Sequence, residues 1–396
     1  MSQLAQNNAI FGTPEAFGVP NGLIPYNWDK AVCVSAEPTV GYEPACFRRK
    51  LVPCWNVGVK ALGSDDKGAL YNRRKGADPA FLNQRAWTIR WSDRKSSVDL
   101  VQQILGPNDR LANQNAPKYP RRDKGLALRT LAWQAKWRGA LNEAENKCHQ
   151  GLARLRGENA GDAMADCYSI LGVISYSRRD LTGARDHVRD GFSCLSENSA
   201  VASRIDLLAT RANIERYSGR LDRAYACLTE AMSLANGAEL ARLEHNIARA
   251  TLQDGYPQQS LEHSESALML AQKFNNRVIL PYAFETMGAA LIDVGQADRA
   301  LDPLSRGLAV ARDEQDHRVE CQLLHEICRV HMAQQEFKTG LPLAVGGQKT
   351  ARDMGYTLWE TKFLELVAYF QDQLGQTEAA LQSFKALVQM RGNNPT

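Results

Sequence analysis

The sequence between residues 126 and 391 repeats seven times, with a spacing of roughly 40 residues. In the clearest unit, residues 208–235, four positions separated by 7, 5 and 7 residues carry Ala212, Gly219, Ala224 and Ala231. The same frame recurs as Ala132, Gly139, Ala144, Gly151; Gly172, Arg179, Ala184, Gly191; Ala248, Gly255, Ser260, Ala267; Gly288, Gly295, Ala300, Gly307; and, more weakly, Arg329, Glu336, Leu341, Gln348 and Ala368, Gly375, Ala380, Leu387. A fixed period of this length is typical of stacked repeat proteins.

The spacing predicts a pair of antiparallel helices in each unit. Small residues let two helix backbones approach closely, and apolar residues at intervals of three and four fill the contact between them. The second position of the frame falls in the predicted turn, where Gly accepts a positive φ at little cost. Because one helix pair cannot bury its own apolar face, neighbouring pairs must stack on it and form a continuous core.

The order small, Gly, Ala, small at these offsets resembles the tetratricopeptide repeat (TPR) family over about two thirds of the chain. The usual TPR unit has about 34 residues, and the longer units here look like the TPR arrays of bacterial regulatory proteins. Those arrays include ones that precede a cyclase or transcription-factor output domain and those of peptide-sensing receptors. The resemblance implies an all-α, right-handed solenoid of about seven helix pairs and a general role in binding.

The first 125 residues differ in composition from the repeats. They carry 18 Lys and Arg against 11 Asp and Glu, whereas the remaining residues carry 30 against 33. This segment is rich in Pro, Gly and Asn, and we expect it to be a largely irregular leader. The alternation of Trp87, Ile89 and Trp91 predicts a short strand at residues 84–91, and residues 97–105 are predicted as a short helix. The predicted organisation is therefore a leader at 1–125, a repeat domain at 126–391 and a tail at 392–396.

The basic leader suggests a nucleic-acid binder as one alternative. Its cationic residues form short clusters, with two tryptophans available for stacking: Arg48, Arg49, Lys50, Arg73, Arg74, Lys75, Arg121, Arg122, Trp55 and Trp87. The clusters are spread along the segment and do not interleave with the aromatic residues. A solvated leader is therefore the favoured interpretation, and nucleic acid is an unlikely partner.

Other features favour a cytoplasmic protein. No apolar run is long enough to span a membrane, and the first residues lack the pattern of a secretory signal. The nine cysteines are scattered without CxxC spacing, so we expect reduced thiols. The chain ends shortly after the last predicted helix, and we expect it to act through a separate partner if its relatives carry an output domain.

Candidate catalytic and metal motifs are weak, and we predict a non-enzymatic protein without a cofactor. Residues 340–350 superficially resemble a phosphate loop, but Gln348 separates Gly347 from Lys349. A second cluster lies on one predicted helix and comprises Cys321, His325, Cys328 and His331. Four ligands on a single straight helix cannot close a tetrahedron around zinc, so packing is the favoured role.

The TPR resemblance implies that the first helix of each unit lines a concave groove. Counting the turn residue as position 15, positions 2, 5, 9 and 12 face this groove and form a basic surface in units three and four. The candidate binding residues are Asn213, Arg216, Arg242, His245, Asn246 and Arg249. Asn213, Arg242 and Asn246 match positions of the carboxylate clamp of TPR domains that grip acidic tails, but Ala209 stands where the clamp has Lys.

Two functions follow from these expectations. The leading one is a protein-interaction or scaffold module whose groove binds a peptide or protein segment, and units three and four would hold an acidic or carboxylate-bearing segment through Asn213, Arg216, Arg242 and Arg249. The alternative is a regulatory sensor whose groove binds a peptide or small ligand and changes curvature. The oligomeric state is left open. In addition, Arg329 at a small-residue position predicts either a local change of pitch or an exposed groove side in unit six. Pro257 is expected near a helix start, and Pro303 is expected to kink its helix.

Overall fold

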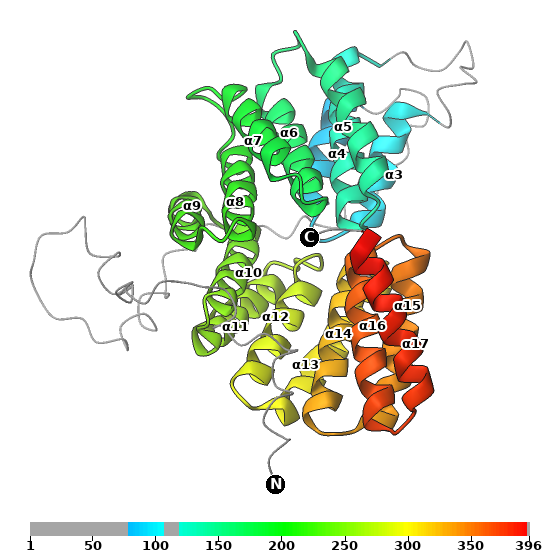
Figure 1. The fold of residues 1–396 in the computed structure, drawn as a ribbon. Helices are drawn as coiled ribbons and strands as arrows, with labels where there is room; N and C mark the ends of the chain where they lie inside the picture. The colour runs from blue at the N-terminus through cyan, green and yellow to red at the C-terminus, as the bar shows by residue number, and fades with distance from the viewer. Residues whose placement is uncertain (1–77, 107–118, 394–396) are drawn as a thin grey trace, which may run out of the picture. The chain divides into compact units, whose positions relative to one another are not determined.

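The computed structural model describes residues 78–106 and 119–393, and this part of the chain is built from helices without any strand (Figure 1). The helices that precede the repeats are α2 (Pro79–Ile89) and α3 (Arg94–Leu105). The first four repeat pairs are α4 (Arg121–Trp137) and α5 (Leu141–Leu155), α6 (Gly161–Ser177) and α7 (Leu181–Ser193), α8 (Val201–Tyr217) and α9 (Leu221–Leu234), and α10 (Ala238–Gln253) and α11 (Pro257–Lys273). The last three are α12 (Leu280–Asp293) and α13 (Ala297–Asp313), α14 (His317–Ala333) and α15 (Phe337–Asp353), and α16 (Thr357–Gln373) and α17 (Thr377–Asn393).

The seven predicted helix pairs are confirmed, and their turns explain the period. Gly139, Gly219, Gly255, Gly295 and Gly375 all have positive φ. In the first turn, the amide of Gly139 donates to the carbonyl of Lys136 at 3.1 Å and that of Ala140 donates to Ala135 at 3.0 Å. These two bonds satisfy carbonyls that the end of a helix leaves free. The period exceeds that of the usual TPR because most of the helices have 17 residues, which makes each about 26 Å long.

Small residues stand where the two helices of a pair touch. Ala184, Ala224 and Ala300 are fully buried or nearly so. At Gly288 on α12, a Cβ atom would overlap the side chain of Leu304 on α13. The first helices also contact one another in succession, from α4 through α16, so they form one continuous inner layer. The sequence frame therefore reports direct backbone approach between helices.

The frame predicted for unit six is wrong by one residue. The left-handed turn residue is Gln335, and Glu336 is the N-cap of α15. The correct frame is Cys328, Gln335, Gly340 and Gly347, whose small members are all buried. Cys328 holds the small-residue position, and Arg329 takes position 9, where it is half-buried and pairs with Asp293 at 2.8 Å and Glu326 at 2.6 Å. The observation from which a change of pitch was inferred is therefore lost. The turn of unit six has no Gly to mark it, and the predicted frame therefore placed the turn at Glu336, one residue after Gln335.

The strand predicted at residues 84–91 is also wrong, because residues 84–89 belong to helix α2. Its start carries a helix signal that the alternating tryptophans concealed. Asp78 caps the helix by accepting from the amide of Ala80 at 3.0 Å, and Pro79 occupies the first helical position. Leu82 and Ala86, four residues apart, form the buried face. Trp91 lies beyond the end of this helix and reaches the core from the connection to α3.

The helical part of the chain therefore begins well before residue 126. The helix expected at 97–105 corresponds to α3, which packs with α2 against α4. Together they bring Trp87, Trp91, Trp133 and Trp137 into one cluster, in which the ring centroids of Trp91 and Trp133 are 4.6 Å apart. Trp87 packs partly buried against this core, whereas the predictions on Trp55 and on the basic residues from Arg48 to Lys75 lie outside the described residues.

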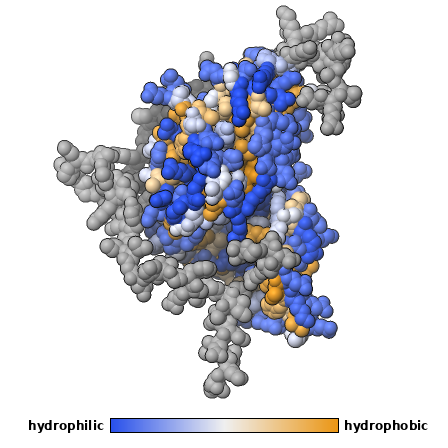
Figure 2. Space-filling view, turned by 45° about the horizontal axis from the view of Figure 1, so that its top comes forward, coloured by the Kyte–Doolittle hydropathy of each residue, from blue (hydrophilic) through white to orange (hydrophobic). Residues whose placement is uncertain are grey.

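Proline positions and the surface agree with a helical repeat. Pro257 is the first residue of α11, as predicted. Helix α13 continues through Pro303, and the kink expected there stays a prediction. On the face shown in Figure 2, hydrophobic residues lie in narrow stripes among hydrophilic ones. Within the described ranges, none of the helices combines the length and the hydropathy that crossing a membrane requires.

Candidate functional site

Four of the six predicted binding residues are engaged inside the protein. Arg242 is only 9% exposed and forms an ion pair with Asp206 of the preceding unit at 2.5 Å. The Asn213 amide donates to the carbonyl of Ala209 in its own helix at 3.1 Å. Asn246 is buried. The three positions that match a carboxylate clamp are thus buried or occupied, and the structure does not present them together to a partner.

His245 is buried and belongs to the interior of the inner layer. Its Nδ1 lies 3.4 Å from the hydroxyl of Thr286, and its ring lies 5.9 Å from that of Tyr282. Burial lowers the pKa of His245 well below its usual value, and the charges of Arg249 and Arg216 lower it further. This side chain is therefore neutral at physiological pH and contributes packing rather than charge.

Arg216 and Arg249 differ from Arg242 because neither forms an ion pair with the described residues. Arg216, at the end of α8, is 6% exposed and donates from Nη1 to Gln253 at 2.8 Å. Its Nε and Nη2 are buried without a hydrogen-bond partner. Arg249, on α10, is half-buried, and the charges of the two arginines oppose each other. Buried donors of this kind are costly unless something accepts from them.

A third arginine, Arg318, joins this pair from the first turn of α14. Its charge acts on Arg249, and the hydroxyls of Tyr282, Tyr176 and Tyr217 raise its pKa although burial opposes this. Sequence reasoning missed Arg318 because it lies four residues ahead of position 2 in the corrected frame of unit six. The longer helices of this chain extend the inner layer by that extra turn. In residues 78–106 and 119–393, no ion pair is formed by Arg216, Arg249 or Arg318.

Two tyrosines complete the group, which we call the arginine–tyrosine cluster (Arg216, Arg249, Arg318, Tyr176 and Tyr217). The rings of Tyr176 and Tyr217 are stacked with centroids 5.2 Å apart, and the guanidinium of Arg216 lies 4.4 Å from the centre of the Tyr217 ring. Burial opposes ionisation of Tyr217, but Arg249, Arg216 and Arg318 outweigh it and lower the pKa of this phenol to about 7. Tyr217 nevertheless remains 45% exposed, so the cluster is open to a ligand.

Lys136 adds a further cation on the same inner layer. Lys136, Tyr176 and Arg216 occupy position 12 of units one to three, 40 residues apart, and this row is a sequence signal that could have located the site. The ammonium of Lys136 lies 4.3 Å from the ring centre of Trp137, and burial lowers its pKa to about 7.

Acidic groups near the cluster neutralise it only in part. Glu285 on α12 faces Arg249, yet burial raises the pKa of Glu285. Glu326 on α14 accepts from His325 at 2.9 Å and from Arg329 at 2.6 Å. These bonds and the charge of Arg329 outweigh burial and lower the pKa of Glu326 to about 2, so its charge is already matched. The cluster keeps an excess of positive charge, which suits a carboxylate or phosphate group.

The Cys and His residues of α14 are dispersed among packing contacts. Cys321 and Cys328 are fully buried in the core that α14 forms with α15 and α16. His325 packs against Trp359 and Phe363, and His331 bonds to Glu336 at 2.9 Å. No group of three metal-binding side chains occurs in the part of the chain that the structure describes.

Solved structures share this architecture at low sequence identity. The Cut9–Hcn1 hetero-tetramer of APC/C matches with a TM-score of 0.58 and 12% identity, over 84% of this chain and 56% of that one. The Rap conjugation gene regulator of plasmid pLS20, in complex with the Phr* peptide, matches with a TM-score of 0.54 and 12% identity. A Rap protein complexed with competence and sporulation factor matches with a TM-score of 0.52 and 14% identity. Both Rap matches cover 80% of this chain and 98% of the other.

The fold follows from these matches. This chain has a TPR-type helical repeat fold. At the sequence level, no protein-family model and no curated protein matches it. The TPR resemblance of the repeat frame is therefore confirmed by structure, at identities where sequence comparison finds nothing.

Proposed function

We propose that this protein is a non-enzymatic, cytoplasmic binding module that holds a carboxylate-bearing peptide or protein segment at the arginine–tyrosine cluster. The observation that carries the proposal is the buried Arg216 guanidinium, which has two unpartnered N–H sites beside two further arginines that form no ion pair. A bound carboxylate would accept from these donors and offset the mutual repulsion of the three cations.

The number of helices that meet at the cluster favours an extended peptide segment as the ligand. Its residues come from α6, α8, α10 and α14, so one ligand would contact the first helices of four different units. Extended segments suit an inner layer built in this way, since each unit offers its own side chains. The pLS20 Rap regulator, which shares the fold, was solved with a bound peptide.

The experiment measures binding of labelled acidic peptides to the full chain by fluorescence anisotropy. The panel pairs Asp/Glu-rich peptides with Lys/Arg-rich peptides of the same length. Arg249→Gln and Arg318→Gln are preferred to changes at Arg216, because Arg216 bonds to Gln253, whereas neither of the other two side chains makes a hydrogen bond or ion pair with the described residues. Each variant should weaken acidic-peptide binding at least tenfold, about 1.4 kcal/mol.

Arg211→Gln is the matched control, since Arg211 is exposed on α8 outside the cluster. It should leave the affinity unchanged. Equal binding of acidic and basic peptides, or equal loss in Arg211→Gln and Arg249→Gln, would contradict the proposal.

A regulatory sensor is the second candidate, and the same convergence of helices favours it. A ligand that joins α8, α10 and α14 would change the angle between units three and six, because each helix belongs to a different pair. Hydrogen exchange tests this: a sensor should show altered protection in turns remote from the cluster when an acidic peptide binds. A static scaffold should show altered protection only near Arg216, Arg249 and Arg318.

A further inference from the structure

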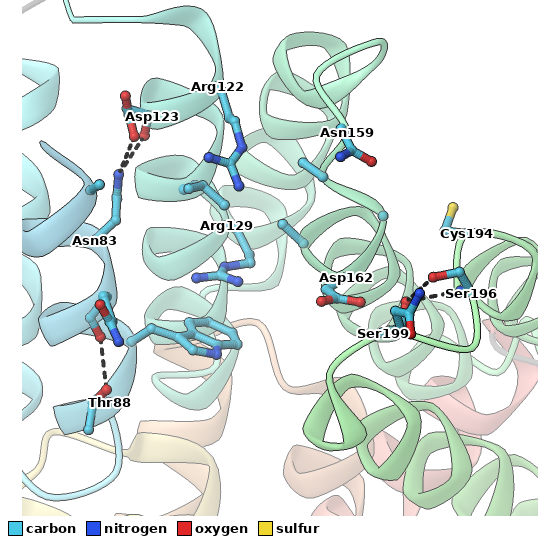
Figure 3. A pocket seen from close by; sticks show the side chains of 18 residues that line it. Asn83, Thr88, Arg122, Asp123, Arg129, Asn159, Asp162, Cys194, Ser196 and Ser199 are labelled. Carbon is cyan, nitrogen blue, oxygen red and sulfur yellow. Dashed lines mark hydrogen bonds between the residues drawn. The ribbon is translucent and has the colours of Figure 1, made fainter.

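A second candidate site lies away from the arginine–tyrosine cluster, in a cavity of about 720 Å³. Its walls are helices α2 and α4, the start of α6 and the loop between α7 and α8 (Figure 3). The volume falls within the range of small-molecule sites, about 300–1,000 Å³. None of the residues of the arginine–tyrosine cluster lines it.

One wall of the cavity is cationic. Arg122 and Arg129 lie two turns apart on α4, and Figure 3 shows both side chains directed into the space between α4 and the start of α6. Arg129 is 8% exposed, donates to Asp166 at 3.1 Å and lies 3.6 Å from the centre of the Trp87 ring. Its Nε is buried without a partner. Arg122 is exposed and makes no hydrogen bond or ion pair with the described residues.

The start of α6 adds open backbone donors on the side of the cavity opposite α4 (Figure 3). Its N-cap, Ala160, supplies no side-chain cap, so the first amides of the helix keep their hydrogen-bonding capacity. Gly161 follows, and a Cβ atom at this position would overlap the carbonyl of Cys194. Glycine thus lets the α7–α8 loop close over the helix start and shape the cavity.

Two side chains that line the cavity, Asp162 and Asn83, each have an acceptor oxygen without a partner. Asp162 accepts from the amide of Ala200 at 3.1 Å through Oδ2, whereas its Oδ1 is buried and unpartnered. Asn83, which is 2% exposed, donates to the carbonyl of Asp123 at 3.1 Å, and its Oδ1 has no partner. The charges of Asp162 and Arg129 act on each other although no hydrogen bond joins them.

This arrangement selects against ligands of a single charge. A simple anion would approach Arg122 and Arg129 but also the carboxylates of Asp162 and Asp123, and a simple cation would meet the opposite conflict. Like charges in a partly desolvated site cost binding energy, whereas matched pairs restore it. A ligand that carries both charges satisfies both walls.

We propose that this cavity binds a small zwitterion, either a free amino acid or a di- or tripeptide. Its carboxylate contacts Arg122, Arg129 and the start of α6, and its ammonium contacts Asp162. An apolar or aromatic side chain packs beside Trp87 and Leu126, which also line the cavity. The site is independent of the proposed peptide binding at the arginine–tyrosine cluster.

The test uses the full chain, calorimetric titration and thermal unfolding. The probes are the twenty L-amino acids and a set of di- and tripeptides with apolar side chains, at millimolar concentration. At least one probe should bind and raise the unfolding temperature. Its N-acetyl and its C-terminal amide derivatives should each bind at least tenfold more weakly, because each lacks one charge.

Variants locate the site. Arg122→Gln should remove the preference for a free carboxylate, and Asp162→Asn should remove the preference for a free amine while its side-chain oxygen still accepts from Ala200. Arg121→Gln, on the neighbouring exposed arginine that does not line the cavity, is the control and should bind as the native chain does. Absence of binding across the panel, binding that both variants leave unchanged, or inorganic phosphate binding as tightly as the best zwitterion would overturn the proposal.

Discussion

At the residue scale, the unusual group is an arginine that is buried without a carboxylate. Arg242 and Arg216 face the same inner layer and are almost equally buried, yet Asp206 neutralises the first and leaves the second with unpartnered donors. Proteins rarely leave charged donors in this state without a ligand. The neighbouring Tyr217 responds to the same excess of positive charge, and its ionisation gives a direct readout of the cluster.

The first prediction concerns ionisation of Tyr217. Because the arginines lower its pKa to about 7 against burial, the phenolate should form between pH 6 and 8. Ultraviolet absorbance near 295 nm should rise in this range in the native chain and stay flat in Tyr217→Phe. Tyr356→Phe is the control, because burial raises the pKa of Tyr356 to about 12. No phenolate signal below pH 9 would contradict the geometry of the cluster.

The same shift predicts a pH dependence of stability. An acid whose pKa is lowered by folding contributes stability that is fully present above its unfolded pKa of about 10 and is lost as pH falls to about 7. The native chain should therefore gain unfolding free energy between pH 7 and 9 relative to Tyr217→Phe. Denaturant unfolding at several pH values measures this difference, and parallel curves for the two proteins would argue against it.

At the element scale, the contact between neighbouring helices, within a pair and between pairs, depends on residues without bulk. The corrected frame of unit six shows this at two adjacent glycines of α15. Gly347 faces Phe363 on α16 so closely that a Cβ atom would overlap its ring, whereas a Cβ atom on Gly346 would meet nothing within 4 Å. Both residues are in the same helix, so a comparison of their substitutions by Ala separates the effect of packing on stability from the effect of helix propensity.

The second prediction compares these two glycines. Gly347→Ala should lower the free energy of unfolding by about 1–2 kcal/mol, because overpacking against the fully buried Phe363 exceeds the gain in helix propensity. Gly346→Ala should raise it by about 0.5–1 kcal/mol through the propensity gain alone. Chemical denaturation measures both values. Equal effects of the two substitutions would show that the frame of unit six has been misplaced again.

At the scale of the whole molecule, the helices before the repeats contact elements far along the chain. Arg94 on α3 donates to the carbonyl of Glu314, at the end of α13, at 3.2 Å. Trp137 on α4 packs against Tyr282 on α12, with ring centroids 5.5 Å apart. These contacts connect α3 and α4 to unit five, and α3 also packs with α2 against α4, so α2 and α3 are part of the repeat fold and not a separate leader.

The third prediction follows from this connection. A fragment that begins at residue 126 loses α2, α3 and the first turn of α4, and it exposes Trp133. It should unfold at least about 5–10 °C below a fragment of residues 78–396, since losing several kcal/mol shifts the midpoint of a domain of this size by about 2–4 °C per kcal/mol. Calorimetry measures the two midpoints. Equal midpoints would mean that α2 and α3 add nothing to stability.

The sequence by itself determined the helix pairs and most of their turns. Small residues at helix contacts and Gly at left-handed turns are local requirements, so they recur at a fixed spacing that can be read without a structure. The same spacing led to Arg216 and Arg249. It failed by one residue at Gln335, a left-handed turn that lacks Gly, and at α2, where alternating tryptophans outweighed the cap formed by Asp78 and Pro79.

Only the tertiary structure decided which of the candidate side chains are open. Asp206 and Arg242 are 36 residues apart and form an ion pair only because the first helices of units three and four stack. Arg318 reaches the cluster from α14 because the inner layer brings helices of distant units together, and the cavity beside Arg129 needs α2, α4, α6 and the α7–α8 loop at once. The repeat pattern reports backbone packing that recurs in each unit, whereas pairing and burial of charge depend on contacts between units that have no fixed spacing in the sequence.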